Sequence, residues 1–295
     1  MAQHIHIRSP DHLGDGVLAL PAVRALCELG ALTIEGPTWA PLLYRHLLPA
    51  RPPVAPADLS VLLKPSFSAA WRALRQGHPR RIGLATDLRR LLLTTAVPQG
   101  DGHRQADLDA VARAAGAVPQ GAPRLPLVEA DFAGAPALRP GTVLMLPGSG
   151  SGDAVEWQGY RALADALTEA GRPVAFAGGP AEEDRWPALA GSHPVLPTLS
   201  IGAFGATAVR AAAVVGNDSG LTHLAAAARR GAGLDVAAVH VVCGGTDPAR
   251  TAAPGATAWA HLPSPPCWPC YRKSCRQEHE CLQTPVSALF SALTA

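Results

Sequence analysis

The residues best suited to binding or catalysis lie within residues 214–225. An apolar run there ends on a glycine, and Asn217, Asp218, Ser219 and Gly220 follow before an alanine-rich helical pattern begins. At such a strand-to-helix junction the first backbone N–H groups lack internal partners and point to one spot, at the positive end of the helix dipole. This arrangement favours an anionic ligand such as a phosphate. Because aspartate and serine are also common helix caps, capping alone explains the same residues.

A second candidate is Asp15, in the segment HLGDGVLALPAV at residues 12–23. The loop after the first expected strand enters a helix at this point. A carboxylate between two glycines at a helix start is suited to act as a general base on an acceptor hydroxyl. The alternative is an aspartate that only caps the helix, since the dipole favours acids in this position.

A glycine-rich loop, LPGSGSGD at residues 146–153, directly follows an expected strand. Such a loop lets its backbone, including Ser149 and Gly150, approach a nucleotide or phosphate closely. Its Gly-x-Gly-x-Gly spacing differs from the Gly-x-Gly-x-x-Gly dinucleotide fingerprint, and no Gly-x-x-x-x-Gly-Lys-Ser/Thr loop is present. The sequence therefore disfavours an NAD-type dehydrogenase and a P-loop hydrolase.

Another glycine-containing segment, GGPAEED at residues 178–184, also follows an expected strand. Glu182 or Glu183 could accept hydrogen bonds from ribose hydroxyls, as acids do at the strand ends of nucleotide-binding sheets. The alternative is an acid-rich first helical turn that the helix dipole stabilises.

Four cysteines, Cys267, Cys270, Cys275 and Cys281, lie within 15 residues near the C-terminus. Four thiolates could hold zinc or iron in tetrahedral geometry. The spacing matches no standard zinc finger, and the cluster stands apart from the other motifs. We therefore expect any metal here, zinc or iron, to be structural.

Short apolar runs alternate with helical patterns along the chain. Strands are expected at 4–8, 31–35, 59–63, 81–83, 142–146, 173–177, 213–216 and 236–242, and helices at 16–29, 40–48, 68–76, 103–116, 157–170, 181–190 and 220–229. The proline-rich segment 117–141 separates the two halves. This pattern predicts two α/β domains with doubly wound parallel sheets, at residues 1–138 and 139–295, with ligands at the carboxyl ends of the strands.

Composition narrows the function classes. The chain has 295 residues, 48% hydrophobic and 16% charged, and a net charge of +2, which does not indicate nucleic-acid binding. It lacks an apolar run of about 20 residues and a signal-peptide pattern, so we expect a cytoplasmic protein. Residues 64–90 contain seven lysines and arginines and one aspartate, a local charge of +6. This stretch suits a phosphorylated or carboxylated partner or an anionic membrane face, or it is a solvated surface whose acids lie elsewhere.

Together these segments resemble the glycosyltransferase family 9 heptosyltransferases of lipopolysaccharide synthesis, over almost the whole chain. The resemblance runs through HLGDGVLALPAV, KPSFSAAWRALRQGHPRRIGLATDLRRLLLT, LPGSGSGDAVEW, GGPAEED, GNDSGLTHLAAA, GGTDPARTAAPG and CWPCYRKSCRQEHECL. The last of these is most similar to the second heptosyltransferase of the pathway. Each motif is weak alone, whereas seven in the family's order are specific.

The resemblance implies a GT-B fold, in which two Rossmann-like domains face an interdomain cleft and the last helix can cross back to the N-terminal domain. The N-terminal domain would bind the acceptor and the C-terminal domain ADP-heptose. Members invert the anomeric centre without a catalytic metal, so the resemblance implies that catalysis requires no cofactor. Carried over to this sequence, Asp15 is the base that deprotonates the acceptor hydroxyl.

The resemblance also implies the binding residues. Asp218 would contact the donor heptose, the amides of Ser219 and Gly220 the diphosphate, and Glu182 or Glu183 the ribose. The full expected donor set is Ser149, Gly150, Glu182, Glu183, Asp218, Ser219, Gly220 and His223. The expected acceptor set, which would meet the phosphates and acid sugars of a lipid A–Kdo core, is Lys64, Arg81, Arg89 and Arg90. Such an acceptor would bring the enzyme to the inner membrane as a peripheral protein.

One departure from the family concerns the residue before Trp157, commonly a lysine that neutralises the donor diphosphate. This chain has Glu156 there. An arginine from elsewhere replaces the lysine, or the helix amides carry more of the charge, or the donor differs. Two other functions stay open: a protein heptosyltransferase with an iron held by four cysteines, and a non-catalytic nucleotide-sugar-binding protein.

Overall fold

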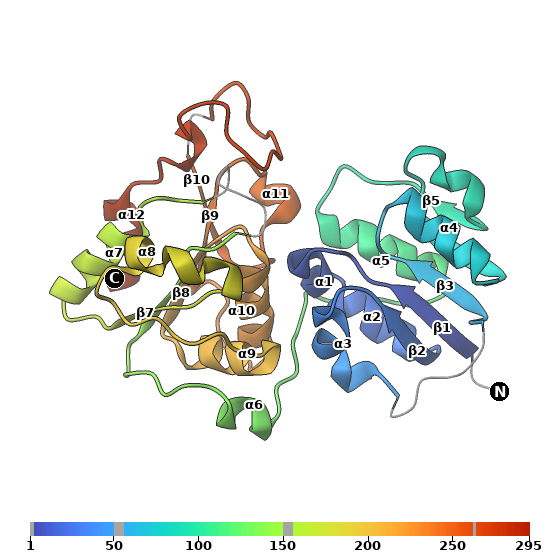
Figure 1. The fold of residues 1–295 in the computed structure, drawn as a ribbon, viewed down its shortest axis with the longest axis horizontal. Helices are drawn as coiled ribbons and strands as arrows, with labels where there is room; N and C mark the ends of the chain where they lie inside the picture. The colour runs from blue at the N-terminus through green and yellow to red at the C-terminus, as the bar shows by residue number, and fades with distance from the viewer. Residues whose placement is uncertain (1–2, 50–55, 150–155, 262–263) are drawn as a thin grey trace. The chain divides into compact units, whose positions relative to one another are not determined.

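A computed structural model describes residues 3–49, 56–149, 156–261 and 264–295. The chain divides into two compact units, Met1–Pro123 and Arg124–Ala295. Each unit contains one five-stranded sheet in which all paired strands are parallel (Figure 1). The expected α/β class with two parallel sheets is confirmed. The division falls inside the proline-rich segment that separates the two halves of the sequence.

The N-terminal sheet has the strand order β2-β1-β3-β4-β5. Its strands are β1 (Gln3–Arg8), β2 (Gly30–Glu35), β3 (Leu59–Leu62), β4 (Arg80–Leu84) and β5 (Thr95–Val97). Its helices are α1 (Leu13–Leu18), α2 (Leu20–Cys27), α3 (Trp39–Leu43), α4 (Phe67–Arg75) and α5 (Arg104–Ala114), with 3₁₀ helices η1 (Arg45–Leu47) and η2 (Asp87–Leu92). Ile5 of the central strand β1 is in register with Leu32 and Leu59, and all three are buried.

The C-terminal sheet has the order β10-β9-β8-β6-β7. Its strands are β6 (Val143–Leu146), β7 (Val174–Phe176), β8 (Ala213–Asn217), β9 (Val239–Cys243) and β10 (Thr257–Ala260). Its helices are α6 (Glu129–Ala133), α7 (Tyr160–Glu169), α8 (Trp186–Ala190), α9 (Ile201–Arg210), α10 (Gly220–Gly231), α11 (Pro248–Thr251) and α12 (Val286–Thr294), with 3₁₀ helices η4 (Pro180–Arg185) and η5 (Glu280–Leu282).

One apolar cluster of the C-terminal unit lies between this sheet and the helices α7 and α12. Met145 and Val215 from the central strands pack in one apolar cluster with Tyr160 of α7. Leu289 and Leu293 of α12 belong to the same cluster, and α12 packs against α7. The buried face of the last helix therefore lies in the C-terminal unit.

Three predicted helices differ from those observed. The helix expected at 40–48 is the short α3 followed by the 3₁₀ helix η1. The helix expected at 16–29 is divided into α1 and α2, and Pro21 lies in the first turn of α2, where proline is favoured. The helix expected at 181–190 is a 3₁₀ helix followed by α8, which again has a proline in its first turn. Within the described part of the chain, no helix is long and apolar enough to span a bilayer.

Candidate functional site

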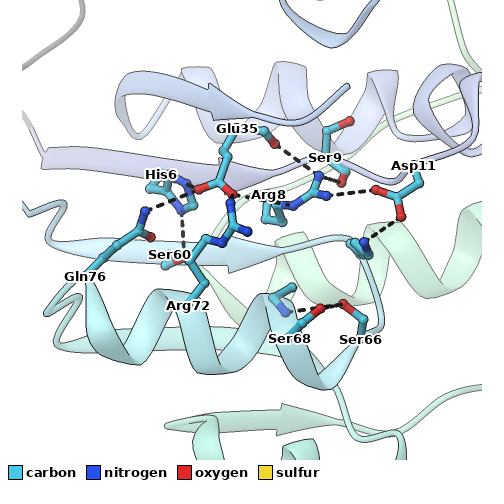
Figure 2. Close-up of polar contacts among 12 residues, drawn as sticks. His6, Arg8, Ser9, Asp11, Glu35, Ser60, Ser66, Ser68, Arg72 and Gln76 are labelled. Atoms are coloured by element: carbon cyan, nitrogen blue, oxygen red, sulfur yellow. Dashed lines mark hydrogen bonds and ion pairs between the residues drawn. The ribbon is translucent and has the colours of Figure 1, made fainter. Parts of the chain in front are cut away.

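The loop after β1, residues 9–12, is fixed by ion pairs at the carboxyl end of the N-terminal sheet. Arg8 donates to the Asp11 carboxylate at 2.8 Å and to the Ser9 carbonyl at 2.6 Å (Figure 2). Lys64, after β3, lies 2.5 Å from the other oxygen of Asp11. Burial acts to raise the pKa of Asp11, but hydrogen bonds from Lys64 and Arg8 outweigh it and lower that pKa. The loop that leads to Asp15 is thus held by charges from two neighbouring strand ends.

Asp15 lies in the first turn of α1, with its side chain about one-quarter exposed. Arg104 Nε donates to Asp15 Oδ1 at 3.2 Å, while Oδ2 has no partner among the residues that the structure describes. The next residue, Gly16, allows close packing, since a Cβ there would overlap the Trp39 ring. The buried Tyr44 hydroxyl donates to the Gly16 carbonyl at 2.7 Å. This packing fixes the first turn of α1, where the Asp15 carboxylate is bonded through one oxygen and partly exposed.

The residues predicted to bind the acceptor lie in different environments. Lys64 is paired with Asp11, and Arg81 donates to the carbonyls of Leu92 and His78 at 2.7 and 2.6 Å. Arg90 is exposed. The charge of the basic stretch is therefore partly neutralised or committed to the backbone.

Arg89 is fully buried, although the sequence predicted it to be an acceptor ligand. One of its terminal nitrogens donates to the Lys64 carbonyl at 2.9 Å, whereas Nε and the other terminal nitrogen have no partner within the described residues. A Cβ on Gly83 would overlap this guanidinium, so the glycine makes room for it. Burial lowers the pKa of Arg89 to about 10. In this structure Arg89 offers no surface to an acceptor, and its predicted role stays a prediction.

Sequence reasoning missed a histidine cluster beside Glu35. His6 and His78 are buried and stack with ring centroids 4.8 Å apart. His6 Nδ1 lies 2.9 Å from Ser60 Oγ, and its Nε2 lies 3.4 Å from Glu35 Oε2 (Figure 2). The cluster lines a cavity of about 380 Å³, and its other lining residues include His4 and Gln76. His4 and His6 stand in alternate positions on one face of β1, but a polar face is not what a buried parallel strand predicts.

The buried histidines should make the protein less stable in acid. Burial lowers the pKa of His6 from 6.5 to about 4, helped by the nearby His78, whose own pKa is lowered mainly by burial. The folded protein therefore binds fewer protons than the unfolded chain between these pH values, and its free energy of unfolding falls by about 3 kcal/mol as the pH is lowered through them. Urea unfolding at a series of pH values measures this loss. His6→Gln should flatten the dependence, whereas substitution of the exposed His46 by Gln should leave it intact.

At the C-terminal sheet, Asp218 directly follows β8 and is buried, with 8% of its surface exposed. Its Oδ2 accepts hydrogen bonds from Thr246 at 2.7 Å and Thr251 at 2.5 Å, and His223 Nε2 lies 3.3 Å from Oδ1. Burial acts to raise the pKa of Asp218, but the hydrogen bonds from His223, Thr251 and Thr246 outweigh it and hold that pKa below its ordinary value. A buried, ionised carboxylate thus stands at the start of α10.

The helix α10 begins without a side-chain cap. Ser219 precedes it in extended conformation, and its hydroxyl accepts no hydrogen bond from the first turn. That hydroxyl lies 3.3 Å from Thr222 Oγ1, which donates to the Asn217 carbonyl at 2.7 Å. The capping interpretation of Ser219 is therefore wrong. The first-turn amides of a 12-residue helix, with Gly220 at its start, are left for another acceptor.

Asn217 joins the end of β8 to the loop after β6. It is fully buried. Its Oδ1 accepts from the Trp157 amide at 3.0 Å, and its Nδ2 donates to the Pro147 carbonyl at 2.6 Å. The glycine-rich loop is therefore held to the strand that carries Asp218.

Glu182 lies between the two glycine segments predicted to approach the nucleotide. Its Oε2 accepts from the Gly179 amide at 2.6 Å, and a Cβ on Gly148 would overlap its carboxylate. Ser149 ends the described part of the glycine-rich loop. Gly150 and the side chain of Glu183 lie outside the described residues.

Glu156, at the position where the resemblance predicts a lysine, is buried and paired. Arg185, the last residue of η4, donates to its two carboxylate oxygens at 2.9 and 2.5 Å. This hydrogen bonding raises the pKa of Arg185. An arginine, Arg185, thus does lie beside position 156, but Glu156 balances its charge. The two residues are 29 positions apart, and nothing in that spacing predicts the pair.

The four cysteines are all described, but they are not arranged as metal ligands. Among described residues no group of three or more His, Cys, Asp or Glu side chains could hold a metal ion. Burial raises the pKa of Cys281 to about 11, and the nearby thiols of Cys275, Cys270 and Cys267 add to this increase. The thiols therefore gather in one region without the geometry of a zinc or iron site.

Each unit has a doubly wound parallel sheet, with a carboxylate at the sheet edge of the first and an uncapped helix beside a buried aspartate in the second. This combination matches the GT-B fold. The sequence model of glycosyltransferase family 9 (heptosyltransferase) matches residues 55–280, and the chain belongs to that family.

Solved structures show the same fold. Heptosyltransferase II of E. coli, an ADP-heptose lipopolysaccharide heptosyltransferase, matches with a TM-score of 0.73 and 20% identity over 99% of this chain and 98% of its own. E. coli heptosyltransferase WaaC with ADP-2-deoxy-2-fluoro heptose matches with a TM-score of 0.71 and 18% identity, over 99% of this chain and 100% of its own. The iron-containing dodecameric glycosyltransferase TibC of enterotoxigenic E. coli matches with a TM-score of 0.67 and 16% identity, over 99% of this chain and 75% of its own. Comparison with curated protein sequences finds no match.

Proposed function

We propose that this protein transfers heptose from ADP-heptose, with inversion, to a hydroxyl of a lipopolysaccharide inner-core acceptor of the Kdo- or heptose-lipid A type. It acts on the cytoplasmic face of the inner membrane as a peripheral protein. The observation that carries the proposal is the uncapped start of α10 beside Asp218. The family match supports this donor, as does the similar fold of WaaC, which was solved with an ADP-heptose analogue.

In this proposal the donor diphosphate lies at the first turn of α10. The bond from the anomeric carbon to the diphosphate oxygen breaks, and ADP leaves with an additional negative charge. The amides of Ser219 and Gly220 and the positive end of the helix dipole stabilise that charge as it develops. Asp218 is held by three side chains, and its carboxylate oxygens retain lone pairs for a heptose hydroxyl. Glu182 or Glu183 binds the ribose.

Asp15 supplies the base. The acceptor hydroxyl oxygen forms the new bond to the anomeric carbon and passes its proton to the free Oδ2 of Asp15. Arg104 holds Oδ1, so it fixes the direction in which the other oxygen points. Lys64, Arg81 and Arg90 complete the predicted acceptor set together with Arg89, which is buried in this structure.

A proline at position 220 tests the diphosphate site directly. Gly220 is the first residue of α10, where proline fits a helix, and Ser219 has φ −142° and ψ 165°, which suits a residue before proline. Gly220→Pro therefore removes one amide donor and retains the helix. Since hydrogen bonds to charged groups contribute about 1.5–3 kcal/mol, ADP affinity measured by calorimetry should fall about tenfold or more.

Gly220→Ala is the matched control, because it changes the same residue and keeps the amide. Its ADP affinity should stay within about twofold of the wild-type value. Equal affinity of the proline and alanine variants would place the diphosphate elsewhere.

The function itself is tested by incubating purified protein with ADP-heptose and truncated core acceptors, and following product by mass spectrometry. Formation of a heptosylated acceptor supports the proposal. Absence of transfer to every truncated core acceptor, with ADP still bound, would instead support a non-catalytic nucleotide-sugar-binding protein.

A protein heptosyltransferase is the second candidate, because the four C-terminal thiols gather in one region and TibC shares the fold. The described cysteines do not fit a metal site as they stand. Iron at one atom per chain in purified protein, together with transfer of heptose to a protein acceptor, would favour this candidate over the lipopolysaccharide enzyme.

A further inference from the structure

The exposed apolar side chains of the N-terminal unit concentrate on α4 and η2. Eleven large apolar side chains are exposed in the described part of the chain, and five of them form what we call the α4–η2 patch: Phe67, Trp71, Leu74, Leu88 and Leu91. Their exposed fractions range from 38% for Leu74 to 74% for Leu91. Scattered single apolar residues are normal on a surface, but a cluster of this kind indicates an interaction site.

The geometry of α4 arranges its three members in one stripe. Phe67, Trp71 and Leu74 are spaced by four and three residues, so they lie on the same side of the helix. The opposite side, with Ala70 and Ala73, packs on Leu62 of β3. The helix is therefore amphipathic in an unusual sense, since its small residues face the core and its large ones face outward.

The 3₁₀ helix η2 extends this surface. It packs against α4, and Leu92 at its end contacts the same inner cluster as Ala70 and Ala73. Leu88 and Leu91 are three residues apart, which places them on one side of a 3₁₀ helix. Both project away from the core.

Exposed arginines lie close in sequence to the patch residues and have no acidic partners within the described part of the chain. Arg75, Arg80 and Arg90 are exposed and have no ion-pair partner among the residues described. Arg72 is excluded from this set because it pairs with Glu35 at 2.9 Å. Asp87 is the only acid between residues 64 and 91. The surface thus combines an aromatic and aliphatic stripe with uncompensated positive charge.

We propose that the α4–η2 patch is the surface by which this protein docks on an anionic lipid bilayer. Tryptophan, phenylalanine and leucine enter the headgroup boundary, while arginines extend their stems along it and keep their guanidinium groups at the lipid phosphates. The stripe requires α4 to lie parallel to the membrane plane. The positive charge favours an anionic bilayer over a neutral one.

This docking surface deepens the proposed function and rests on it in one respect, namely that the acceptor is attached to a lipid. Docking through this patch would hold the N-terminal unit, which carries Asp15, at the surface where such an acceptor is embedded. Neither the base nor the donor residues form part of the patch.

The test is partitioning of the full-length protein onto vesicles of phosphatidylcholine with phosphatidylglycerol, compared with phosphatidylcholine alone. Wild-type protein should bind the anionic vesicles, and more weakly as salt is raised. The triple variant Phe67→Ser, Trp71→Ser, Leu74→Ser should bind at least about tenfold more weakly. Arg75→Glu with Arg80→Glu should remove the preference for anionic lipid.

A matched control removes exposed apolar side chains elsewhere in the same unit. Leu42→Ser with Val118→Ser changes residues of similar exposure outside the patch and should leave vesicle binding unchanged. Transfer to a water-soluble truncated acceptor should be unchanged in the triple variant, which shows that the variant is folded. If wild-type protein transfers no heptose, the proposed function fails while vesicle binding still decides the docking surface.

Two results would overturn the inference. One is binding of the triple variant to anionic vesicles as tightly as the wild type, or no binding by either. The other is a wild-type dimer in light scattering that the triple variant loses without any change in vesicle binding, which would assign the patch to a second copy of the chain.

Discussion

Asp15→Asn is expected to reduce heptosyl transfer by about 10²–10⁴-fold, the range contributed by a positioned general base. Asparagine has nearly the same size and can still receive the hydrogen bond from Arg104 through its amide oxygen. The amide nitrogen, which replaces Oδ2, cannot take up the proton of the acceptor hydroxyl. The packing of Gly16 against Trp39 and Tyr44 does not depend on the charge, so the fold should persist.

The measurement is turnover at saturating ADP-heptose, together with ADP affinity by calorimetry. Affinity for ADP should be unchanged, because Asp15 belongs to the N-terminal unit and the proposed diphosphate site to α10. Asp11→Asn is a useful control, since it alters a carboxylate in the loop that leads to Asp15, and that carboxylate is already paired with Lys64 and Arg8. Equal turnover of Asp15→Asn and wild type would exclude Asp15 as the base.

Asn217→Ala is expected to destabilise the C-terminal unit by about 3 kcal/mol. The side chain is fully buried and bonds two backbone groups, the Trp157 amide and the Pro147 carbonyl. Alanine would leave both without a partner in a site closed to water, and an unsatisfied buried group costs about 1–3 kcal/mol. The released glycine-rich loop should also weaken ADP binding.

Calorimetric unfolding with and without ADP measures both effects, with the two units treated as separate transitions. The control is Gln158→Ala, an exposed side chain in the same segment, which should change stability by less than about 0.5 kcal/mol. A similar small change for Asn217→Ala would show that water replaces both hydrogen bonds.

The central strands were predictable because strands buried on both faces read as continuous apolar runs, as in Val143–Leu146 and Ala213–Asn217. The edge strands β5 and β10 were missed because they are short and partly exposed. The helix α9 was missed because two glycines interrupt its pattern, IGAFGATAVR.

The candidate site was predictable where it depends on strand-to-helix junctions, as at Asp15 and Asp218. The residues that bond Asp15 and Asp218 could not be predicted, because they are distant in sequence. Arg104 lies 89 residues from Asp15, and Thr251 lies 33 residues from Asp218. The basic stretch shows the same limit. Its sequence contains seven cations, yet Arg89 is buried and Lys64 is neutralised by an acid outside the stretch.

The missing cap of α10 links the stability of this helix to the binding of the nucleotide. A serine cap contributes about 1 kcal/mol to a helix, and Ser219 forgoes it. If the diphosphate accepts from the same amides, ADP itself supplies the cap, and the stability gained by the helix is part of the binding free energy. The nucleotide-free enzyme would then carry an uncapped first turn at the point where the donor arrives, and each turnover would cap and uncap that turn once.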